Sequence, residues 1–465
     1  MGRIGKCFRV TQRLDAMPKL WEKDWKLDEE IEKFETRGDI GLDQNLGEFD
    51  VYCSLAHVSM LSKIGIISNN ELLQAKKSLL KSLSLIKAGK FSLEEGDEDI
   101  HTKIENFVTS DSGEVGKKMH TGRSRNDQVL TDMRLYTKSN LLKIWKETIL
   151  LSKQFAEFAK KYEFMAMPGY THMQKAMPSS VGMWAASFSE ALLDDLALIK
   201  TAYALNDKSP LGSAAAYGVP LDLDREYTAK ILGFNSLQKN SLYCQNSRGK
   251  AESETIAVLN SLLFDINKFA SDVMLFTTSE FGYFKVDEKL CSGSSIMPQK
   301  KNIDVAELLR SKIHLGLGYY AASSSLASNL PSGYNRDLQD GKPLLMKEIE
   351  VALESLKITG ILLNGLHPNV EKMKEALTPE IFATHNAIGM VAKGKPFRDA
   401  YKAAGKKPNG HMPKDIGTIL KSSKHLGGTG NLSLGSYLAQ AEKEKNELEK
   451  EKNRFENAIN ALIKS

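Results

Sequence analysis

The pattern of apolar and polar residues predicts several unusually long helices. Residues 127–162 contain neither proline nor glycine, and apolar residues such as Val129, Met133 and Tyr136 recur at spacings of three and four. Residues 250–280 show the same helical periodicity without a break. At about 1.5 Å per residue, such helices reach about 45 to 55 Å, several times the usual length. Stretches with the same pattern predict further helices over 179–206, 304–329 and 341–364.

Helices of this length cannot all bury their apolar faces inside one compact subunit, so a bundle shared between subunits is the economical solution. We therefore expect an all-α fold with a central helical bundle over residues 118–365. A mostly helical N-terminal part, residues 17–117, precedes it, and a smaller helical C-terminal part, residues 366–465, follows it. Within this last part, residues 436–465 predict a charged helix whose Glu and Lys residues form a solvated face.

Composition and charge are those of a folded chain without an extended nucleic-acid surface. Of the 465 residues, 42% are hydrophobic and 26% are charged, which excludes disorder along most of the chain. The net charge is only +5, which argues against a protein that coats nucleic-acid phosphates. Residues 1–16 hold four basic residues and one acidic residue. We interpret them as a disordered extension ahead of a start near Met17, rather than as a transit peptide.

Cysteine spacing and hydropathy indicate a protein of the cytoplasm. Cys7, Cys53, Cys244 and Cys291 are widely separated and form no C-x-x-C pair, so we expect neither a disulfide framework nor a zinc site. No apolar run reaches the roughly 18 residues needed to span a bilayer. The chain also lacks a P-loop and a dinucleotide-binding glycine pattern. We therefore expect no metal, no cofactor, no nucleic acid and no membrane among its partners.

Four polar, glycine-containing segments lie at predicted helix boundaries, where loops held by rigid helices often carry function. They are His120–Val129, Pro168–Gln174, Cys291–Asn302 and Pro331–Lys342. Their arginines, lysines and neutral hydrogen-bond donors suit a small substrate with more than one carboxylate. Without a metal or a cofactor, the chemistry would proceed by proton transfer from side chains alone.

His172 and Ser294 are the candidates for that proton transfer. Taken singly, each is also compatible with a structural role. A lone histidine beside a Tyr-Thr turn is more often structural than catalytic, and a Gly-Ser-Ser loop is more often a linker. The four segments considered together favour the catalytic interpretation.

These segments resemble a known enzyme family. The loop Gly293–Asn302 resembles the signature loop of the fumarase/aspartase superfamily, whose members release fumarate from succinyl compounds. Further runs resemble the argininosuccinate lyase/delta-crystallin family within that superfamily: Thr121–Val129, Pro168–His172, and Tyr334–Gln339 with Lys342. The resemblance covers about residues 20–405. It implies a three-domain, mostly helical homotetramer whose long helices merge into one central bundle, with each active site assembled from loops of three subunits.

The resemblance also implies the reaction and the residues that perform it. The family cleaves argininosuccinate reversibly to arginine and fumarate, the last step of arginine biosynthesis and a step of the urea cycle. Ser294 would transfer the proton on the carbanion side, while Lys300 and Asn302 would hold the carboxylate and His172 would handle the other proton. The sequence leaves open which group is acid and which is base, and whether Ser295 takes the place of Ser294. The implied substrate-binding residues are Ser54, Arg125, Asn126, Thr171, Tyr334, Gln339 and Lys342, with His101 as a structural contributor nearby.

Several positions depart from the family pattern. Cys53 replaces a usual glycine, Met177 a usual glutamine, and Ile303 a usual proline, while residues 243–249 differ from a commoner acidic segment. None of these positions is among the residues assigned to chemistry. The alternatives are a sister lyase that acts on adenylosuccinate and a non-enzymatic, crystallin-like relative.

Overall fold

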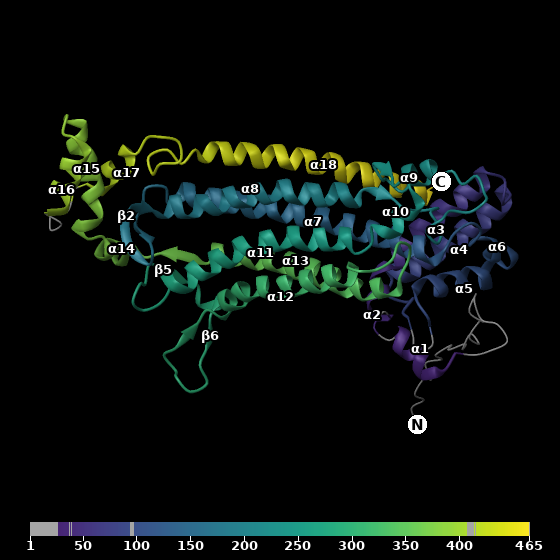
Figure 1. The fold of residues 1–465 in the computed structure, drawn as a ribbon. Helices are drawn as coiled ribbons and strands as arrows, with labels where there is room; N and C mark the ends of the chain where they lie inside the picture. The colour runs from purple at the N-terminus through teal and green to yellow at the C-terminus, as the bar shows by residue number, and fades with distance from the viewer. Residues whose placement is uncertain are drawn as a thin grey trace, which may run out of the picture.

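The computed structural model of the chain describes residues 27–36, 38, 40–93, 97–406, 413 and 415–464. Long helices lie side by side and give the molecule an elongated shape (Figure 1). They are α7 (Arg125–Lys161), α8 (Val181–Asn206), α11 (Lys250–Phe276), α12 (Asp304–Ala327), α13 (Gly341–Asn364) and α18 (Leu434–Lys464). The predicted all-α fold is confirmed, and each predicted long helix is present with boundaries close to those expected. The expectation for residues 1–16 lies outside the described residues, and the proposed domain boundaries stay a prediction.

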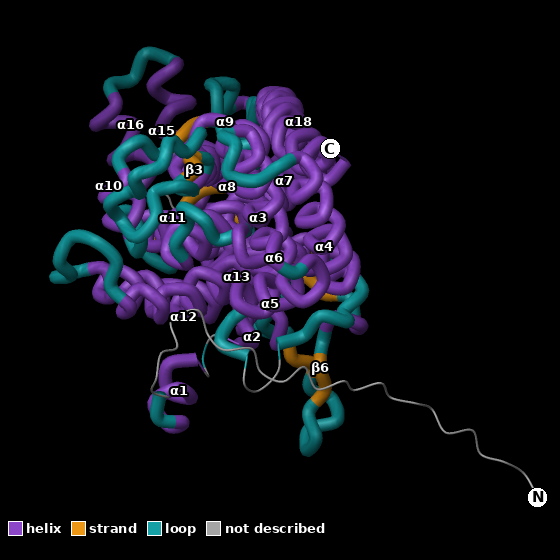
Figure 2. Tube along the Cα trace, turned by 90° about the vertical axis from the view of Figure 1, so that its right-hand side faces the viewer, coloured by secondary structure: helices purple, strands orange, loops and turns teal. Residues whose placement is uncertain are grey.

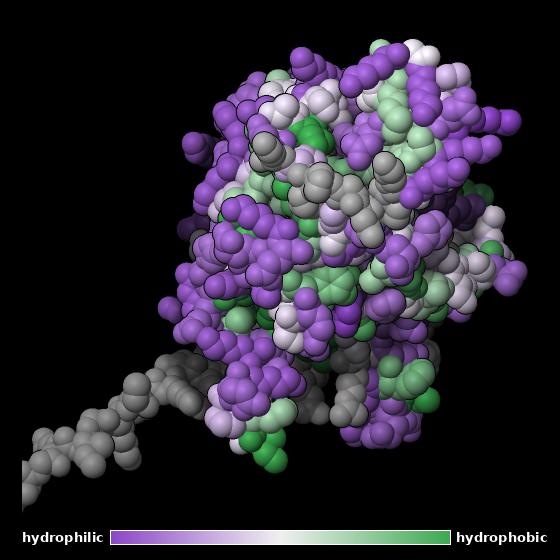
Figure 3. All heavy atoms as spheres, turned by 90° about the vertical axis from the view of Figure 1, so that its left-hand side faces the viewer, coloured by the Kyte–Doolittle hydropathy of each residue, from purple (hydrophilic) through white to green (hydrophobic). Residues whose placement is uncertain are grey.

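Shorter elements gather at the two ends of the bundle (Figures 1 and 2). Around the N-terminal end of α7 lie α1 (Glu29–Thr36), α2 (Ile40–Asp43), α3 (Gly47–Lys63), α4 (Asn69–Lys87), α5 (Ile100–Ser112), α6 (Glu114–Lys118), α9 (Arg225–Ile231) and α10 (Ser241–Asn246), with the 3₁₀ turns η1 (Gln44–Leu46) and η3 (Arg336–Asp340). At the opposite end lie α14 (Val370–Ala376), η4 (Pro379–Phe382), α15 (Ala383–Ala392), α16 (Phe397–Lys406) and α17 (Ile416–Ser422). Figure 3 views this second end and shows a mainly hydrophilic surface interrupted by small apolar patches.

The strands in the described part of the chain form two-stranded pairs only. The longest pair is the antiparallel hairpin of β1 (Ala166–Thr171) and β2 (Gln174–Ser180), which joins α7 to α8. The others are the parallel pair β3 (Lys208–Ser209) with β4 (Ser236–Leu237), and the antiparallel pairs β5 (Phe284–Val286) with β8 (Leu366–Pro368) and β6 (Ser292–Gly293) with β7 (Lys301–Asn302). The turn η2 (Glu288–Leu290) lies between β5 and β6.

Local capping explains where α7 begins. The Ser124 side chain accepts from the helix backbone and Asp127 bonds back to the Ser124 N–H at 2.9 Å, which completes a capping box. The second carboxylate oxygen of Asp127 accepts from the N–H groups of Gly212 and Ala214 at 2.8 and 2.9 Å. These bonds hold the start of α7 against the 210–214 turn. The backbone that carries the side chains of the first helical turn is therefore fixed in position.

The bundle core is apolar, with aromatic contacts between helices. The rings of Phe155 on α7 and Phe269 on α11 meet edge to face at 5.1 Å, and Phe188 on α8 meets Phe269 in the same way at 5.5 Å. Helix α12, by contrast, leaves several large apolar side chains exposed: Leu308, Leu315, Leu317 and Tyr320. Scattered apolar side chains are normal on a surface, but these lie on more than one side of a single long helix, which fits a helix that other subunits surround.

Helix α18 is tied to α7 by buried charges. Lys138 of α7 is fully buried, and its Nζ donates to Asp207 Oδ1 and to the Gly233 carbonyl, both at 2.5 Å. Arg454 of α18 donates to the same Gly233 carbonyl at 2.8 Å and forms an ion pair with Asp207. Burial lowers the pKa of Lys138 to about 8, although Asp207 opposes that effect. The predicted solvated face of this helix is present, but Glu444 is an exception, since it is buried and pairs with Lys200.

None of the helices in the described part of the chain combines the length and the apolarity needed to cross a lipid bilayer.

Candidate functional site

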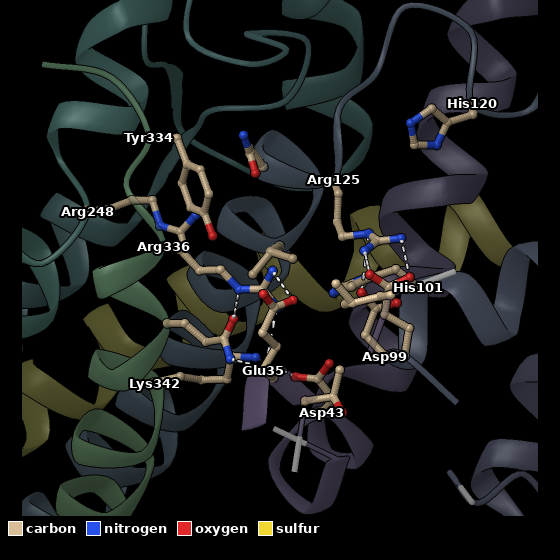
Figure 4. A pocket seen from close by; sticks show the side chains of 16 residues that line it. Glu35, Asp43, Asp99, His101, His120, Arg125, Arg248, Tyr334, Arg336 and Lys342 are labelled. Atoms are coloured by element: carbon tan, nitrogen blue, oxygen red, sulfur yellow. Dashed lines mark hydrogen bonds and ion pairs between the residues drawn. The ribbon is translucent and has the colours of Figure 1, made fainter. Parts of the chain in front are cut away.

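A cavity of about 570 Å³ opens beside the N-terminal end of α7 (Figure 4). Its walls come from α1, α2, α5, the first turn of α7 and the segment that runs through η3 into α13. Five of the predicted substrate-binding residues line it: Arg125, Asn126, Tyr334, Gln339 and Lys342. The fold therefore brings together residues that are more than 200 positions apart in the sequence.

Most cations of the cavity are already paired with carboxylates. Lys342 Nζ bonds Asp43 Oδ1 at 2.5 Å, and both side chains are buried. Arg336 pairs with Glu35 at 3.0 Å. Charge-assisted bonds of this kind are the strong ones among protein hydrogen bonds. These pairs hold the walls of the cavity in place and give it carboxylates as well as cations.

Arg125 is held on the other wall by the start of α5. Its guanidinium bonds Glu98 at 2.5 Å, Asp99 at 3.2 Å and the Thr102 hydroxyl at 2.9 Å. Asp99 in turn caps α5 by accepting from the Thr102 N–H at 2.7 Å. Burial lowers the pKa of Arg125, but Asp99 and Glu98 outweigh it and raise that pKa, so the guanidinium stays charged.

A buried group of charged side chains lies beneath the cavity. His101 Nδ1 is 3.0 Å from Asp50 Oδ1 and 3.3 Å from Asp132 Oδ2, and Gln128 donates to Asp50 at 2.5 Å. Burial lowers the pKa of His101, but Asp50 and the neighbouring carboxylates raise it to about 9. Asp50, His101 and Asp132 are close enough together to hold a cation. Their distances fit equally a protonated imidazole that bridges two carboxylates, which is the role the raised pKa supports.

Ser54 does not line this cavity. It is completely buried in α3, where its Oγ accepts from Arg123 Nη1 at 3.0 Å. Arg123 is itself buried, and its Nε and Nη2 have no hydrogen-bond partner among the described residues. The other predicted binding residues near the N-terminal end of α7 line the cavity, whereas Ser54 lies behind its wall.

Thr171 and His172 lie at the opposite end of the bundle, on the tip of the β1–β2 hairpin. His172 and Met173 form its two-residue turn with φ values of 53° and 61°, and Thr171 pairs with Gln174. Such turns strongly favour Asn-Gly, because other side chains are strained in the left-handed region. Non-glycine residues held in this way cost of order 1 kcal/mol or more each and cluster at functional sites. The exposed His172 is therefore presented by a backbone that the surrounding structure must enforce.

Aromatic rings anchor the strand that leads into the turn at His172. The hydroxyl of Tyr170, two residues before His172, is 2.5 Å from that of Tyr283, and its ring lies 5.7 Å from Phe281. This side of β1 is therefore anchored to the segment that follows α11. The strand that leads into the histidine turn is thus held by aromatic contacts.

Ser294 lies on the excursion between β6 and β7, which projects from the bundle in both views (Figures 1 and 2). Its Oγ accepts from the N–H groups of Met297 at 3.1 Å and Ile296 at 3.4 Å. Backbone donors aimed at a hydroxyl oxygen would stabilise its alkoxide. Ser295 and Lys300 are exposed on the same loop, Lys301 pairs with Glu288, and Asn302 belongs to β7.

The predicted residues thus form two groups in one subunit. Arg125 is the first residue of the 37-residue α7, whereas the hairpin with His172 follows its last turn. At about 1.5 Å per residue, that helix alone separates the two groups by about 55 Å. Within the described part of a single subunit, the structure does not bring Thr171, His172 or the Ser294 loop to the cavity.

Comparison with known proteins places the chain. The family model described as "Lyase" matches residues 9–314. The argininosuccinate lyase of Thermotoga neapolitana is 43% identical over 389 residues, covering 84% of this chain and 98% of that protein. That of Phocaeicola vulgatus is 37% identical, covering 89% and 92%. The chain belongs to the argininosuccinate lyase family.

Solved structures agree on the fold. An EDDS lyase variant with bound fumarate superposes with a TM-score of 0.76 at 22% identity, covering 90% of this chain and 91% of that one. The class II fumarase of Schistosoma mansoni gives 0.66 at 17% identity, covering 79% and 88%. The long-helix fold of this chain is thus shared with both of these enzymes.

The departures from the argininosuccinate lyase pattern fall in different surroundings. Cys53 is fully buried in α3, and burial raises the pKa of its thiol. Met177 is exposed on β2, and Ile303 immediately precedes α12. Only the 243–249 segment reaches the cavity, through Arg248.

Sequence reasoning missed several cavity residues. Arg248, Glu35 and Asp43 were not predicted, although each lines the cavity. For Arg248 the available signal was the departure of its segment from the family pattern. Glu35 and Asp43 carried no signal, since nothing in a charge pattern shows that an acidic residue will meet Arg336 or Lys342 some 300 positions later.

Proposed function

We propose that this member of the family is itself an argininosuccinate lyase, which cleaves argininosuccinate reversibly to arginine and fumarate. The observation that carries the proposal is the cavity, in which Arg125, Asn126, Tyr334, Gln339 and Lys342 converge. The substrate combines a guanidinium, an ammonium and three carboxylates. A cavity that offers both carboxylates and cations suits such a ligand, and the curated relatives of the chain are named for this reaction.

The reaction is a β-elimination, and the chain's residues supply its proton transfers. Ser294, as the alkoxide that its backbone donors stabilise, takes the proton from the carbon next to a carboxylate and becomes a neutral hydroxyl, and the electron pair left behind is delocalised into that carboxylate. The C–N bond then breaks, its electrons stay on the guanidino nitrogen, and His172 delivers a proton on that side. Lys300, Asn302 and the backbone donors of the loop stabilise the negative charge where it develops. Thr171 binds substrate in the assembled site, whereas Ser54, predicted as a binding residue, is buried behind the cavity wall and accepts a hydrogen bond from Arg123.

A complete site requires more than one subunit. The cavity residues and the His172 and Ser294 loops lie about the length of α7 apart, so loops from neighbouring subunits must complete each cavity. We propose a homotetramer in which three subunits contribute to every site. The apolar side chains that α12 exposes on more than one side support a helix that is surrounded by other helices in this assembly.

The reaction would serve as the last step of arginine biosynthesis in the cytoplasm, where free thiols such as Cys53, Cys244 and Cys291 persist. The residues that carry the proposed chemistry include no metal ligand, and the proton transfers need no cofactor.

Purified protein tested with argininosuccinate and with adenylosuccinate in parallel decides the substrate. Ultraviolet absorbance of released fumarate should rise with argininosuccinate alone. A signal only with adenylosuccinate would assign the chain to a sister lyase. No signal with either substrate, from a protein that is assembled and folded, would favour a crystallin-like relative.

A further inference from the structure

The position of Ser294 depends on the short stem that carries its loop. Ser294 directly follows β6, and the antiparallel pair of β6 and β7 forms the stem on which the loop projects from the bundle (Figure 1). On one flank of the stem, Ser292 donates to Asp304. On the other flank, Lys301 forms an ion pair with Glu288. These bonds tie the stem to the residues on either side of it, so its direction depends on how those residues are held.

The root of the loop, residues 287–290, lies against the segment that follows α13. Strands β5 and β8 pair so that Lys285 lies opposite His367, and the Asp287 N–H donates to the Gly365 carbonyl at 2.9 Å. A Cβ at Gly365 would clash with Leu290 Cδ1. Leu290, the last residue of η2, therefore packs directly on the bare backbone at Gly365.

Asp287 connects this segment to the root. Its side chain accepts from His367 Nε2 at 2.8 Å, whereas its carbonyl accepts from the Leu290 N–H at 2.9 Å. The hydrogen bond from His367 holds the pKa of Asp287 below its usual value, and Lys289, 3.4 Å from the other carboxylate oxygen, acts in the same direction. The carboxylate is therefore ionised, and this one residue fixes β8 to the turn from which the stem arises.

The Asp287–His367 pair is partly exposed, with 34% and 53% of the two side chains accessible. Ion pairs in such surroundings contribute little to the free energy of unfolding. Loss of the pair should therefore leave the subunit folded while the root of the loop gains freedom. Since a misplacement of about 1 Å can cost about 100-fold in rate, even a weak bond at the root is enough to affect turnover.

We propose that Asp287 and His367 are positioning residues for Ser294, an inference that rests on the proposed function. The pair holds the stem in the direction that brings Ser294 to the cavity of a neighbouring subunit. Neither residue lines the cavity of its own subunit, and both act through the loop. Their contribution is to kcat, because the residues that bind the arginine half of the substrate lie in the cavity and not on the loop.

Steady-state kinetics with argininosuccinate test the pair. Asp287→Ala and His367→Ala should each lower kcat about 10- to 100-fold and leave KM within about threefold. The double variant should be no slower than the slower single variant, since both substitutions remove the same bond. His367→Gln, whose amide can still donate to Asp287, should recover most of the wild-type kcat.

Hydrogen exchange of residues 288–302, measured by mass spectrometry on the assembled protein, is the second readout. Exchange should be faster in both alanine variants, while gel filtration and thermal unfolding stay as in wild type. Glu375→Ala is the matched control, because it removes an exposed ion pair with Lys372 on α14, at the same end of the bundle but outside the loop and its root. That variant should keep the wild-type kcat and the wild-type exchange.

A variant on the opposite side of the contact covers the case in which Asp287→Ala does not assemble. Gly365→Ala leaves the pair intact, but its Cβ displaces Leu290 and with it the root. It should lower kcat and speed exchange in residues 288–302 in the same way. Unchanged kcat and exchange in an assembled Gly365→Ala protein would contradict the proposal.

The positioning role and the proposed function fail in different ways. A wild-type protein that cleaves argininosuccinate, with alanine variants that keep its kcat or whose effects add in the double variant, overturns the positioning role and leaves the proposed function intact. A loss of kcat that only accompanies a loss of thermal stability would assign the pair to structure alone. If only adenylosuccinate is cleaved, the proposed function fails, while the same kinetics with that substrate still test the pair. A wild-type protein that releases no fumarate from either substrate overturns both.

Discussion

Arg125 and His172 lie at opposite ends of α7 in the same subunit. The helix is continuous between them, from its capping box at Ser124 to its end at Lys161. Its length far exceeds the reach of a small substrate. If both residues act on one substrate, as the proposed function requires, each meets its counterpart on a neighbouring subunit, and the site is then a property of the assembly.

Mixing two inactive variants tests this arrangement. His172→Asn and Arg125→Gln should each lose nearly all fumarate release as homo-oligomers. Co-expressed hybrids should recover about a quarter of wild-type activity, because an intact His172 and an intact Arg125 then meet at about one site in four when subunits assort randomly. Activity per site after purification of the hybrids is the measurement. Hybrids no more active than the sum of their parents would show that both residues act within one subunit.

Ser294→Ala should reduce kcat by about 10²- to 10⁴-fold, the usual value of a proton-transfer group. The variant removes the hydroxyl whose oxygen accepts from the Met297 and Ile296 N–H groups, the donors that would stabilise its alkoxide. Ser295→Ala is the matched control and should stay within a few-fold of wild type in the fumarate assay. The reverse pattern would move the catalytic role to Ser295.

His172→Asn separates chemistry from backbone strain. Asparagine tolerates the left-handed conformation that His172 adopts at φ 53°, so thermal unfolding should be little changed while kcat falls about 10²- to 10⁴-fold. Met173→Asn, at the neighbouring left-handed position, should remain active. If His172→Asn keeps most of its turnover, the strained turn has a structural purpose only.

A buried acid makes stability depend on pH. Glu348 of α13 is completely buried, with no hydrogen-bond partner for either carboxylate oxygen among the described residues. It packs on Gly316 of α12, where a Cβ would lie 2.9 and 3.0 Å from the two oxygens. Burial raises the pKa of Glu348 to about 7. The neutral acid is therefore the form that the bundle accommodates.

Because this folded-state pKa lies above the unfolded value, the protonated acid contributes fully below about pH 4.5, and its contribution is lost as pH rises through 7. Wild type should lose up to about 3 kcal/mol relative to Glu348→Gln between pH 5 and pH 8. Urea unfolding of both proteins at one protein concentration measures this difference. Parallel pH profiles would mean that Glu348 is solvated or paired in the assembled protein.

Helices were the predictable part of the fold. A run without proline or glycine and with a 3.6-residue period predicts α7 over 127–162, and the structure has Arg125–Lys161. The β1–β2 hairpin was not predicted as strands, because Pro168 and Pro178 break the usual strand pattern and its turn residues, His172 and Met173, are not those that normally mark a hairpin.

The site was predictable only through motifs. Five motif residues do converge on the cavity, yet no local pattern shows that Lys342 will meet Asp43, 299 positions away. Nor does a local pattern show that Arg248 will stack on Tyr334. Periodicity also assigns a charged residue such as Lys138 to a solvated face, whereas partners distant in sequence make its burial tolerable.

The charged side chains that join α7 to α18 predict how truncated forms of this protein would behave. A premature stop codon between residue 343 and Arg454 would leave every catalytic loop encoded, since all of them precede residue 343. Such a product would nevertheless lose the guanidinium that Asp207 and Gly233 share with Lys138, together with the apolar side of α18. Late nonsense and frameshift mutations in this gene should therefore act by failed folding and degradation, with no damage to the chemistry itself.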